Sequence, residues 1–488
     1  MNLALIVIFA FLAFALFLGI RARRGQDMDL EQWTVGGRGF GTLFVFLLLA
    51  GEIYTTFTFL GGSGWAYGEG GPAFYILSYG CLAYVMSYWL LPAIWRYATE
   101  HRLHSQSDFF VKKYDSKGLG VFISIVAVVA MVPYLALQLQ GLGIIVSVAS
   151  YGTISPLVAA IIGTVAVTTY VMISGIRGSA WTAVIKDAMV LVVVVFMGIY
   201  LPFTIYGGIG DMFREIQAQK PGFLALPTEG YSVSWFVSTV LLTALGFYMW
   251  PHYFTSTFSA DNERIFRRNA IFLPLYQLVL LFVFFVGFAA VLQVPGLSGE
   301  RIDESLLLVS KEEFGPFVVG LIGATGLLTA LVPGSIILMV ASTVLAKNVF
   351  GALSPSTSER SIGTLAKVLV PVVALVSLWF SQQSGQGVVL LLLLGYSLVT
   401  QLFPAVIFSL MHNNFVTKWG AAAGIAAGVA TVTYVTAEGT AIGDLLPFLP
   451  QTLADTNIGI VALFVNFVVL VAVSSATGGF AVRREQSA

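Results

Sequence analysis

The sequence predicts an all-α polytopic membrane protein, and three observations support this fold class. Hydrophobic residues make up 58% of the 488 residues and charged residues only 10%, against about 25% charged residues in soluble domains. The mean hydropathy is +0.90. Apolar runs long enough to cross a bilayer as helices, about 20 residues each, recur along the chain with no long polar block between them. We therefore expect one transmembrane domain over residues 1–488, embedded in a lipid bilayer.

Thirteen apolar segments are candidates for membrane spans. Flanking polar and charged residues set their boundaries. The segments are residues 2–20, 40–66, 72–97, 119–147, 155–174, 180–206, 233–253, 270–294, 315–346, 363–382, 385–411, 414–437 and 456–478.

The basic residues predict the orientation of these spans. With the N-terminus outside, four of the 24 lysines and arginines fall in external loops: Arg214, Lys220, Arg301 and Lys311. Lys186 lies within a span, and the others fall on the cytoplasmic side or at its edge, as the positive-inside rule predicts. We expect a multi-pass protein of the cell membrane with a cytoplasmic C-terminus.

Charge and reactive residues exclude several function classes. The 24 acidic residues balance the basic ones, so we expect no nucleic-acid partner. The single cysteine cannot form an internal disulfide, and the four histidines do not have the spacing of a metal site. We expect no cofactor.

The stretch AGEIYTTFTFLGGSG within span 40–66 is unusual for a helix in lipid. It combines Glu52 with three threonines and three glycines. Glycines weaken helix continuity, and non-helical backbone at membrane depth is tolerated where it lines a cavity or is buried in protein. An interrupted helix with polar side chains is typical of a transporter binding site. Close packing through small residues is the alternative interpretation.

A second interrupted helix is expected in span 233–253, which carries ALGFYMWPHYF. It lies five helices after the first and runs in the opposite direction. Residues 40–206 and 233–411 therefore form two predicted inverted repeats, with helix breaks near 51–64 and 245–251. The spans 2–20, 414–437 and 456–478 lie outside the repeats.

Three motifs resemble the sodium:solute symporter family. They are FLGGSG in the second span, YVMISGIRGSAWTAVIKD before the sixth and PHYFTSTFSADNERIFRRNA after the seventh. GEIYTTFT, PYLALQLQG and VIKDAMV are most similar to the monocarboxylate permease branch. The resemblance implies a leucine-transporter-like fold of thirteen helices with a 5+5 inverted repeat. It also implies cation-driven uptake of a small organic solute by alternating access.

The resemblance implies a sodium site from which this sequence departs. The family joins carbonyls of the interrupted second span, here Gly51 and Tyr54, to hydroxyls of the ninth span. The hydroxyl positions align with Val332 and Pro333, whose side chains lack the oxygen ligands that a hard cation needs. Thr329, one turn earlier, is the oxygen left from that group. The sodium site is therefore expected to be degenerate.

Lys186 and Asp187 stand one turn after Ala183, where many family members carry an aspartate. Lys186 is about six residues into its span, roughly 9 Å deep, and an intramembrane lysine is by default a functional-site hypothesis. Burial favours its neutral form, so it could carry a proton or replace the cation, with Glu52 or alternatively Asp187 as partner. A static ion pair and a snorkelling lysine are the other interpretations.

We expect the solute to bind in one midplane cavity. Hydroxyls and exposed helix N-termini suit a carboxylate. Glutamines there could instead join helices, and His252, placed at a cytoplasmic helix end, is expected to be structural. The assigned residues are Thr55, Thr56, Thr58, Gln138, Tyr248, Trp250 and Gln401.

The function that we predict is symport of a short monocarboxylate with a coupling ion, H⁺ or Na⁺. Protons are favoured because of Lys186. The alternatives are a sodium-coupled symporter of an amino acid or vitamin-like acid, a channel, and an intramembrane enzyme. Repeated pore loops or charged rings would indicate a channel, and a metal or Ser-Lys pattern an enzyme; the sequence shows neither. We therefore expect a transporter without enzymatic activity.

Overall fold

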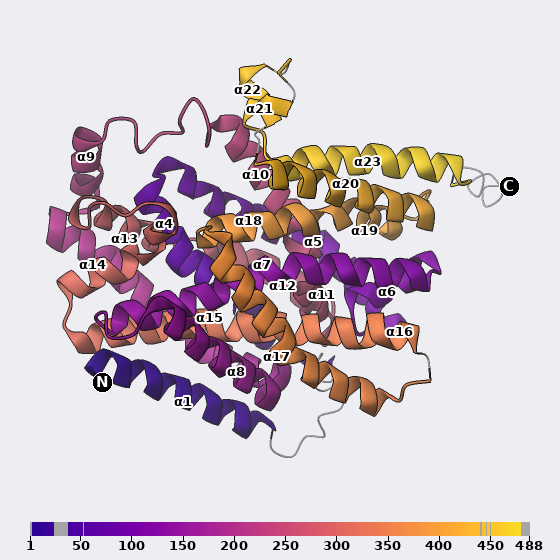
Figure 1. Ribbon diagram of the computed structural model, residues 1–488, viewed down its shortest axis with the longest axis horizontal. Helices are drawn as coiled ribbons and strands as arrows, with labels where there is room; N and C mark the ends of the chain where they lie inside the picture. Colours follow the sequence, from indigo (N-terminus) through magenta and orange to yellow (C-terminus); the bar gives the residue numbers. More distant parts are fainter. Residues whose placement is uncertain are drawn as a thin grey trace.

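The computed structural model describes residues 2–23, 38–51, 53–354, 356–439, 442–445, 447, 448 and 450–479. In these residues the protein is a bundle of long helices, many of which lie along its long axis while others cross it obliquely (Figure 1). Among the described residues, eleven helices have the length and hydropathy to cross a membrane, and a pair of helices bent by 48° makes a twelfth candidate. The all-helical membrane fold is confirmed.

The long helices correspond to predicted spans. The span 264–293 is built from two consecutive helices, and so is the span 388–410, where a short 3-10 turn joins them. The bounds are α1 (Leu3–Arg23), α5 (Tyr75–Glu100), α7 (Lys117–Ala149), α8 (Pro156–Tyr206), α12 (Arg264–Gln277), α13 (Leu280–Gln293), α15 (Pro316–Val344), α17 (Glu359–Ser384), α18 (Val388–Val399), η7 (Thr400–Leu402), α19 (Phe403–Leu410), α20 (Lys418–Glu438) and α23 (Ile458–Ala476).

The predicted second span is interrupted. Helix α3 (Thr42–Gly51) ends at the break, and the chain resumes as a π-helix, η2 (Phe57–Gly61), followed by α4 (Gly62–Gly68). This interrupted span is not among the candidates with sufficient helix length, and Glu52 lies outside the described residues. The count of thirteen spans therefore stays a prediction. Helix α1 begins at one end of the bundle and α23 ends at the other (Figure 1), as an odd number of crossings requires.

The glycines of the second span have a different role from the predicted one. The backbone leaves the helix at residues 53–55, before the glycines. A Cβ at Gly61 would lie 3.0 Å from Val388 and Val389 side-chain atoms, and one at Gly64 would lie 2.8 Å from Asp303 Oδ1. These glycines therefore allow close packing of neighbouring elements, while the break itself lies at residues 53–55.

The second break lies where the sequence predicts it. Helix α10 (Val233–Gly246) passes into a 3-10 turn, η4 (Phe247–Met249), and α11 (Pro251–Phe258) begins after Trp250. Trp250 has an extended backbone, with φ −61° and ψ 132°, and Pro251 has no amide hydrogen to continue the helix. The span therefore bends here and continues to Phe258, past the predicted end at residue 253.

Helix α8 contains a third break, at Gly175, whose φ of 58° and ψ of −170° are non-helical. Glycine adopts this backbone conformation at low cost. It divides α8 into two spans, 156–175 and 178–206, as expected. The remaining short helices are η3 (Gly71–Phe74), α6 (Gln106–Tyr114), α9 (Ile209–Gln219), η5 (Gly299–Glu304), α14 (Ser305–Glu313), η6 (Leu345–Phe350), α16 (Gly351–Leu353), α21 (Ile442–Leu445) and α22 (Gln451–Ala454).

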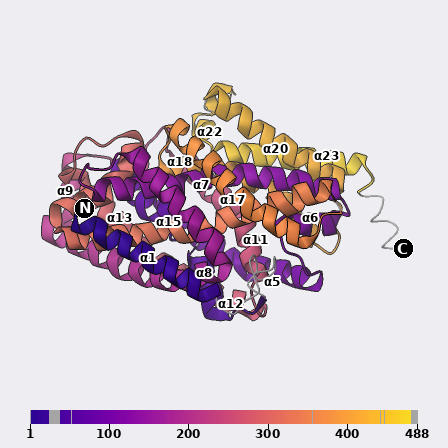
Figure 2. The same ribbon diagram turned by 60° about the horizontal axis from the view of Figure 1, so that its bottom comes forward.

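Helix α15 forms the centre of the bundle. The most apolar stretch of its span is completely buried, and α15 packs against α1, α7, α8 and α17. Helices α20 and α23 lie side by side at one edge in both views (Figures 1 and 2). Because α7 and α15 both contact η2, they bring their polar side chains to the first break. The inverted relation of the two repeats stays a prediction.

Candidate solute and cation site

The first helix break is stabilised by its own threonines. The Thr58 hydroxyl donates to the Ile53 carbonyl at 2.8 Å and accepts from the Thr55 amide at 3.0 Å. The Thr55 hydroxyl accepts from the Phe57 amide at 3.1 Å. Buried backbone groups need such partners where a helical turn is missing. Thr55 and Thr58 therefore hold the break, and of the three predicted threonines we keep Thr56 as a solute contact.

Lys186 reaches this break from α8. Its side chain is fully buried, and its ammonium donates to the Tyr54 carbonyl at 3.1 Å. Lys186 Nζ also lies 2.8 Å from Asp187 Oδ1, so the alternative partner is in contact with it. Glu52, the first partner named from the sequence, lies outside the described residues. The contact of Lys186 with the second span is present, and its role in coupling stays a prediction.

Helix α15 packs against both α3 and η2. Val332 and Pro333 are buried and offer no side-chain oxygen. The Thr329 hydroxyl donates to the Gly326 carbonyl at 2.7 Å, which leaves its lone pairs able to accept. Within the described part of the chain, no cluster of His, Cys, Asp and Glu could hold a metal. The ninth span therefore contributes fewer side-chain oxygens than the family resemblance implies, and the Lys186 amino group lies at the break instead.

Thr56 and Gln138 make a second contact across the break. The Thr56 amide donates to Gln138 Oε1 at 3.3 Å, and both side chains are fully buried. Gly141 makes the approach possible, since a Cβ there would lie 1.9 Å from the Thr56 methyl group. The Thr56 hydroxyl and the Gln138 amide nitrogen have no hydrogen-bond partner among the described residues. A bound acceptor such as a carboxylate would satisfy both donors.

Aromatic side chains surround the second break. The Trp250 ring lies 4.8 Å from that of Tyr134 and 5.3 Å from that of Tyr396, measured between centroids. Tyr248 and Tyr253 pack at 5.9 Å, and all five rings are buried. The structure therefore brings the predicted residues Tyr248 and Trp250 into one aromatic cluster.

Comparisons with known proteins identify the family. The family model described as "Sodium:solute symporter family" matches residues 33–428. The chain belongs to the sodium:solute symporter family. The uncharacterized symporter YhjB of Bacillus subtilis is 64% identical to it over 98% of both chains.

Two further comparisons extend this result. A monocarboxylate transport permease protein of Rhizobium johnstonii is 28% identical to this symporter, over 84% of this chain and 83% of its own. The solved structure of a Na⁺-coupled sialic acid symporter, in a substrate-bound outward-open state, has the same fold, with a TM-score of 0.80 at 17% identity over 98% of both chains. The protein is thus an integral membrane, cation-coupled symporter and not an enzyme.

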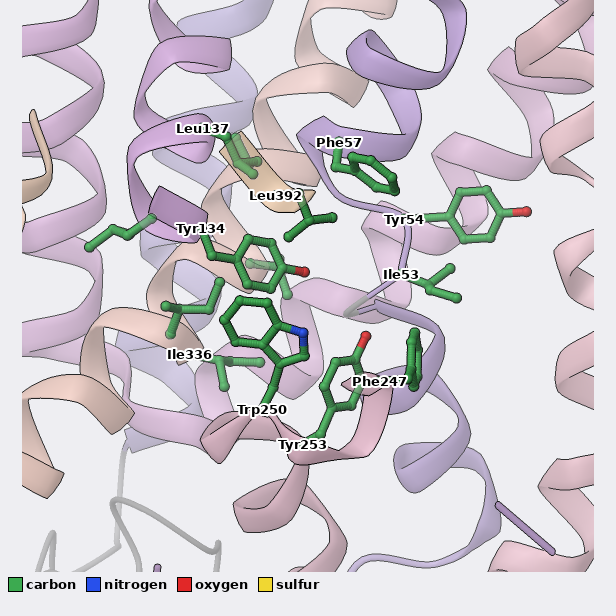
Figure 3. Packing of buried hydrophobic residues seen from close by; sticks show 14 of the residues in the cluster. Ile53, Tyr54, Phe57, Tyr134, Leu137, Phe247, Trp250, Tyr253, Ile336 and Leu392 are labelled. Atoms are coloured by element: carbon green, nitrogen blue, oxygen red, sulfur yellow. The ribbon is translucent and has the colours of Figure 1, made fainter. Parts of the chain in front are cut away.

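Two aromatic residues beside the second break of this symporter, Tyr134 and Tyr253, are absent from the prediction. Their oxygens and the Trp250 indole nitrogen point toward the same region beside Ile53 (Figure 3). Tyr134 precedes Gln138 by four residues, so both lie on one face of α7. That spacing is the sequence signal that could have identified Tyr134.

His252 is the third such residue. It is fully buried, and its ring lies 5.4 Å from Tyr134 and 4.8 Å from Tyr253. Its two ring nitrogens have no hydrogen-bond partner in the described part of the chain. The placement of His252 at a cytoplasmic helix end was wrong, because the bent span continues beyond it through α11.

Gln401 requires a correction. Its amide donates to the Ser397 carbonyl at 3.0 Å and to the Gly459 carbonyl at 3.2 Å. Its side-chain oxygen accepts from Asn466 at 3.1 Å. Because Gly459 and Asn466 belong to α23, Gln401 joins helices instead of contacting the solute. This was the alternative role considered for membrane amides.

A polar cluster joins two elements at the end of the bundle predicted to face the cytoplasm. Lys347 donates to Asp108 Oδ2 at 2.6 Å and Asn348 to Asp108 Oδ1 at 2.8 Å. Burial alone would raise the pKa of Asp108, but the Lys347 charge and these hydrogen bonds lower that pKa overall. Asp108 is therefore ionised at neutral pH and joins α6 to η6.

Proposed function

We propose that this symporter imports a short monocarboxylate and couples its transport to protons through Lys186. One observation carries the coupling proposal: the buried Lys186 ammonium lies 3.1 Å from the Tyr54 carbonyl, at the break where the family resemblance expects sodium. The similarity to a protein described as a monocarboxylate transport permease supports the choice of solute.

The proton on Lys186 controls a bridge between two helices. The protonated side chain donates to the Tyr54 carbonyl and pairs with Asp187. Loss of the proton removes the ion pair and leaves Asp187 as a buried carboxylate, which costs several kcal/mol. The neutral amine donates more weakly to the Tyr54 carbonyl, so a separation of the break from α8 that lets water reach Asp187 becomes more favourable. Protonation is therefore linked to the relative position of the two helices, as coupling requires.

The solute occupies the space between the two breaks. The Thr56 hydroxyl and the Gln138 amide, which have no partner among the described residues, donate to its carboxylate. The rings of Tyr134, Trp250 and Tyr253 face the same space (Figure 3) and cover its apolar part. A Cβ at Gly395 of α18 would lie 2.6 Å from the Trp250 ring, so little room exists behind the indole. Such close packing favours a short carbon chain.

Uptake by vesicles that contain the purified protein tests this proposal. Labelled propionate, lactate and pyruvate are offered, with proline as a solute of a different class, and proton and sodium gradients are imposed separately. We expect an inward proton gradient without sodium to concentrate a monocarboxylate. Protein-free vesicles measure the passive entry of the neutral acids.

Three variants locate the coupling. Lys186→Ala should abolish accumulation, and Lys186→Arg should retain solute binding without accumulation, because arginine keeps its proton. The exposed Lys220→Ala is the matched control and should behave as the unmodified protein. If a sodium gradient at constant pH drives uptake and Lys186→Ala preserves it, the coupling proposal is wrong. If no carboxylate is taken up, the solute proposal is wrong.

A further inference from the structure

The loop that precedes α15 contains a buried carboxylate. Asp303 belongs to η5, at the end of the bundle that the basic residues predict to be external, and its exposed fraction is 0%. Its neighbours Glu300 and Glu304 line a cleft of about 220 Å³ together with Arg301, Ser381 and Gln382. Water and protons can therefore come close to Asp303 from this side, although the carboxylate itself is covered.

Asp303 joins three elements that are distant in the sequence. Its Oδ2 accepts from the amide of Val388, the first residue of α18, at 2.8 Å. A Cβ on Gly64 of α4 would lie 2.8 Å from Oδ1, which has no hydrogen-bond partner among the described residues. We call the contact of Asp303, Val388 and Gly64 the outer junction. It connects the external loop to α18 and to the outer half of the first broken span.

We propose that the outer junction is a proton-controlled latch of the external gate, closed when Asp303 is protonated and released when Asp303 is ionised. The latch acts on two elements that follow the first break toward the predicted external side, α4 and the start of α18, and this carboxyl group holds them together. The inference rests on the predicted orientation and on the family's transport activity. It does not depend on the identity of the solute or of the coupling ion.

The electrostatics of the outer junction set the direction of the effect. Burial, and then the charges of Glu300 and Glu304, raise the pKa of Asp303 to about 7, against the lowering effect of the Val388 amide. An exposed aspartate has a pKa of about 4. Since the closed state has the higher pKa, acid stabilises it and this stabilisation is lost as the external pH rises through about 7.

Other charged groups near the outer junction are few. Arg301 of the same loop pairs with Glu304 at 3.5 Å. Helix α4 contributes Tyr67, whose hydroxyl donates to the Val294 carbonyl, and Glu69 follows its last residue. The packed segments of η2, α7 and α18 carry no charged side chain at this end. The last turn of α14 carries charged residues about two turns away: Lys311, Glu312 and Glu313.

The accessibility of a cysteine at the solute site measures the opening of the latch directly. Thr56→Cys is introduced together with Cys81→Ser, and the chain is reconstituted with its external face outward. A membrane-impermeant methanethiosulfonate reagent is added at external pH 5.5 to 8, with the internal pH held constant. If the pKa of Asp303 is about 7 in the closed state and about 4 in the open state, the equilibrium constant for closing falls about 30-fold from pH 5.5 to 8.

Asp303→Asn in the same background separates the latch from the pH dependence of the thiol. Asparagine keeps the shape of the protonated carboxyl group, so the site should stay closed at every pH. The rise in labelling rate from pH 5.5 to 8 should be about 30-fold larger in the chain that retains Asp303 than in the Asp303→Asn variant. Glu300→Gln is the matched control on the same loop, and its labelling should retain most of this pH dependence.

Two results would overturn the proposal. One is an equal pH dependence with and without Asp303→Asn, and the other is a dependence on internal instead of external pH. If the asparagine variant does not fold, the chain that retains Asp303 still decides the question. After correction for the ionisation of the introduced thiol, its labelling rate must change with external pH with a midpoint near pH 7. Because labelling needs no solute and does not measure transport, failure of the latch and failure of the proposed function are distinguishable.

Discussion

Thr56→Val and Thr58→Val are nearly isosteric changes two residues apart, and the structure predicts opposite consequences for them. The Thr58 hydroxyl is bonded to the Ile53 carbonyl and the Thr55 amide. The Thr56 hydroxyl has no partner among the described residues. Thr58→Val should therefore lower the stability of the folded protein, whereas Thr56→Val should weaken solute binding.

The expected magnitudes follow from the hydrogen bonds that are lost. Thr58→Val weakens the bonding of two buried backbone groups, for which we expect a loss of about 1–3 kcal/mol in the free energy of unfolding. These two groups remain hydrogen-bonded to each other, because the Thr55 amide also donates to the Ile53 carbonyl at 2.9 Å. We therefore expect a loss of stability in the lower part of this range. Thr56→Val removes one donor to a carboxylate, worth about 1.5–3 kcal/mol, or about 10- to 150-fold in solute affinity.

Thermal unfolding of the purified variants in detergent measures the first effect, and the dependence of initial uptake rate on solute concentration measures the second. Thr56→Val should unfold at the same temperature as the unmodified protein and require a higher solute concentration. Thr58→Val should unfold at a lower temperature with nearly unchanged solute affinity. A Thr58→Val protein of normal stability and reduced affinity would show that the Thr58 hydroxyl contacts the solute.

Four further changes test other parts of the account. Gln401→Ala should lower thermal stability through its lost bonds to α23 without changing solute affinity, and an affinity loss without destabilisation would restore Gln401 to the site. Gly141→Ala should disrupt uptake, because the added Cβ would overlap the Thr56 methyl group; normal uptake would refute the close approach of α7. Gly64→Ala should push the external loop away and raise cysteine labelling at acidic pH, which unaltered labelling would contradict. Asp108→Asn should weaken the contact between α6 and η6 at neutral pH by about 1–3 kcal/mol, seen as a lower unfolding temperature; an unchanged temperature would contradict it. Since the pKa of Asp108 is lowered, the unmodified contact should persist as pH falls to about 4.

The sequence predicted the features that depend on composition and local backbone chemistry. Apolar length gave the spans, and Trp250-Pro251 marked the second break, since proline cannot continue a helix. Lys186 stood out because a charge at membrane depth is costly, and its contact with Tyr54 follows from the alignment of the sodium site.

Features that depend on packing between distant helices could not be predicted in this way. Gln401 is bonded to α23, which lies outside the predicted repeats, and nothing near it in the sequence indicates that contact. The glycines of the second span were interpreted as the break, but Gly61 and Gly64 serve close packing against α18 and η5. Asp303 looks like an ordinary loop carboxylate until Val388, 85 residues later, is placed against it.

The central claim, that the proton on Lys186 is transported with the solute, is tested most directly by the proton flux itself. A pH-sensitive dye is enclosed in sodium-free vesicles that start at equal pH on both sides, and a monocarboxylate is added outside. We predict internal acidification beyond that of protein-free vesicles, and its loss in Lys186→Arg. Solute entry without additional acidification, or acidification that persists in Lys186→Arg, would contradict the claim.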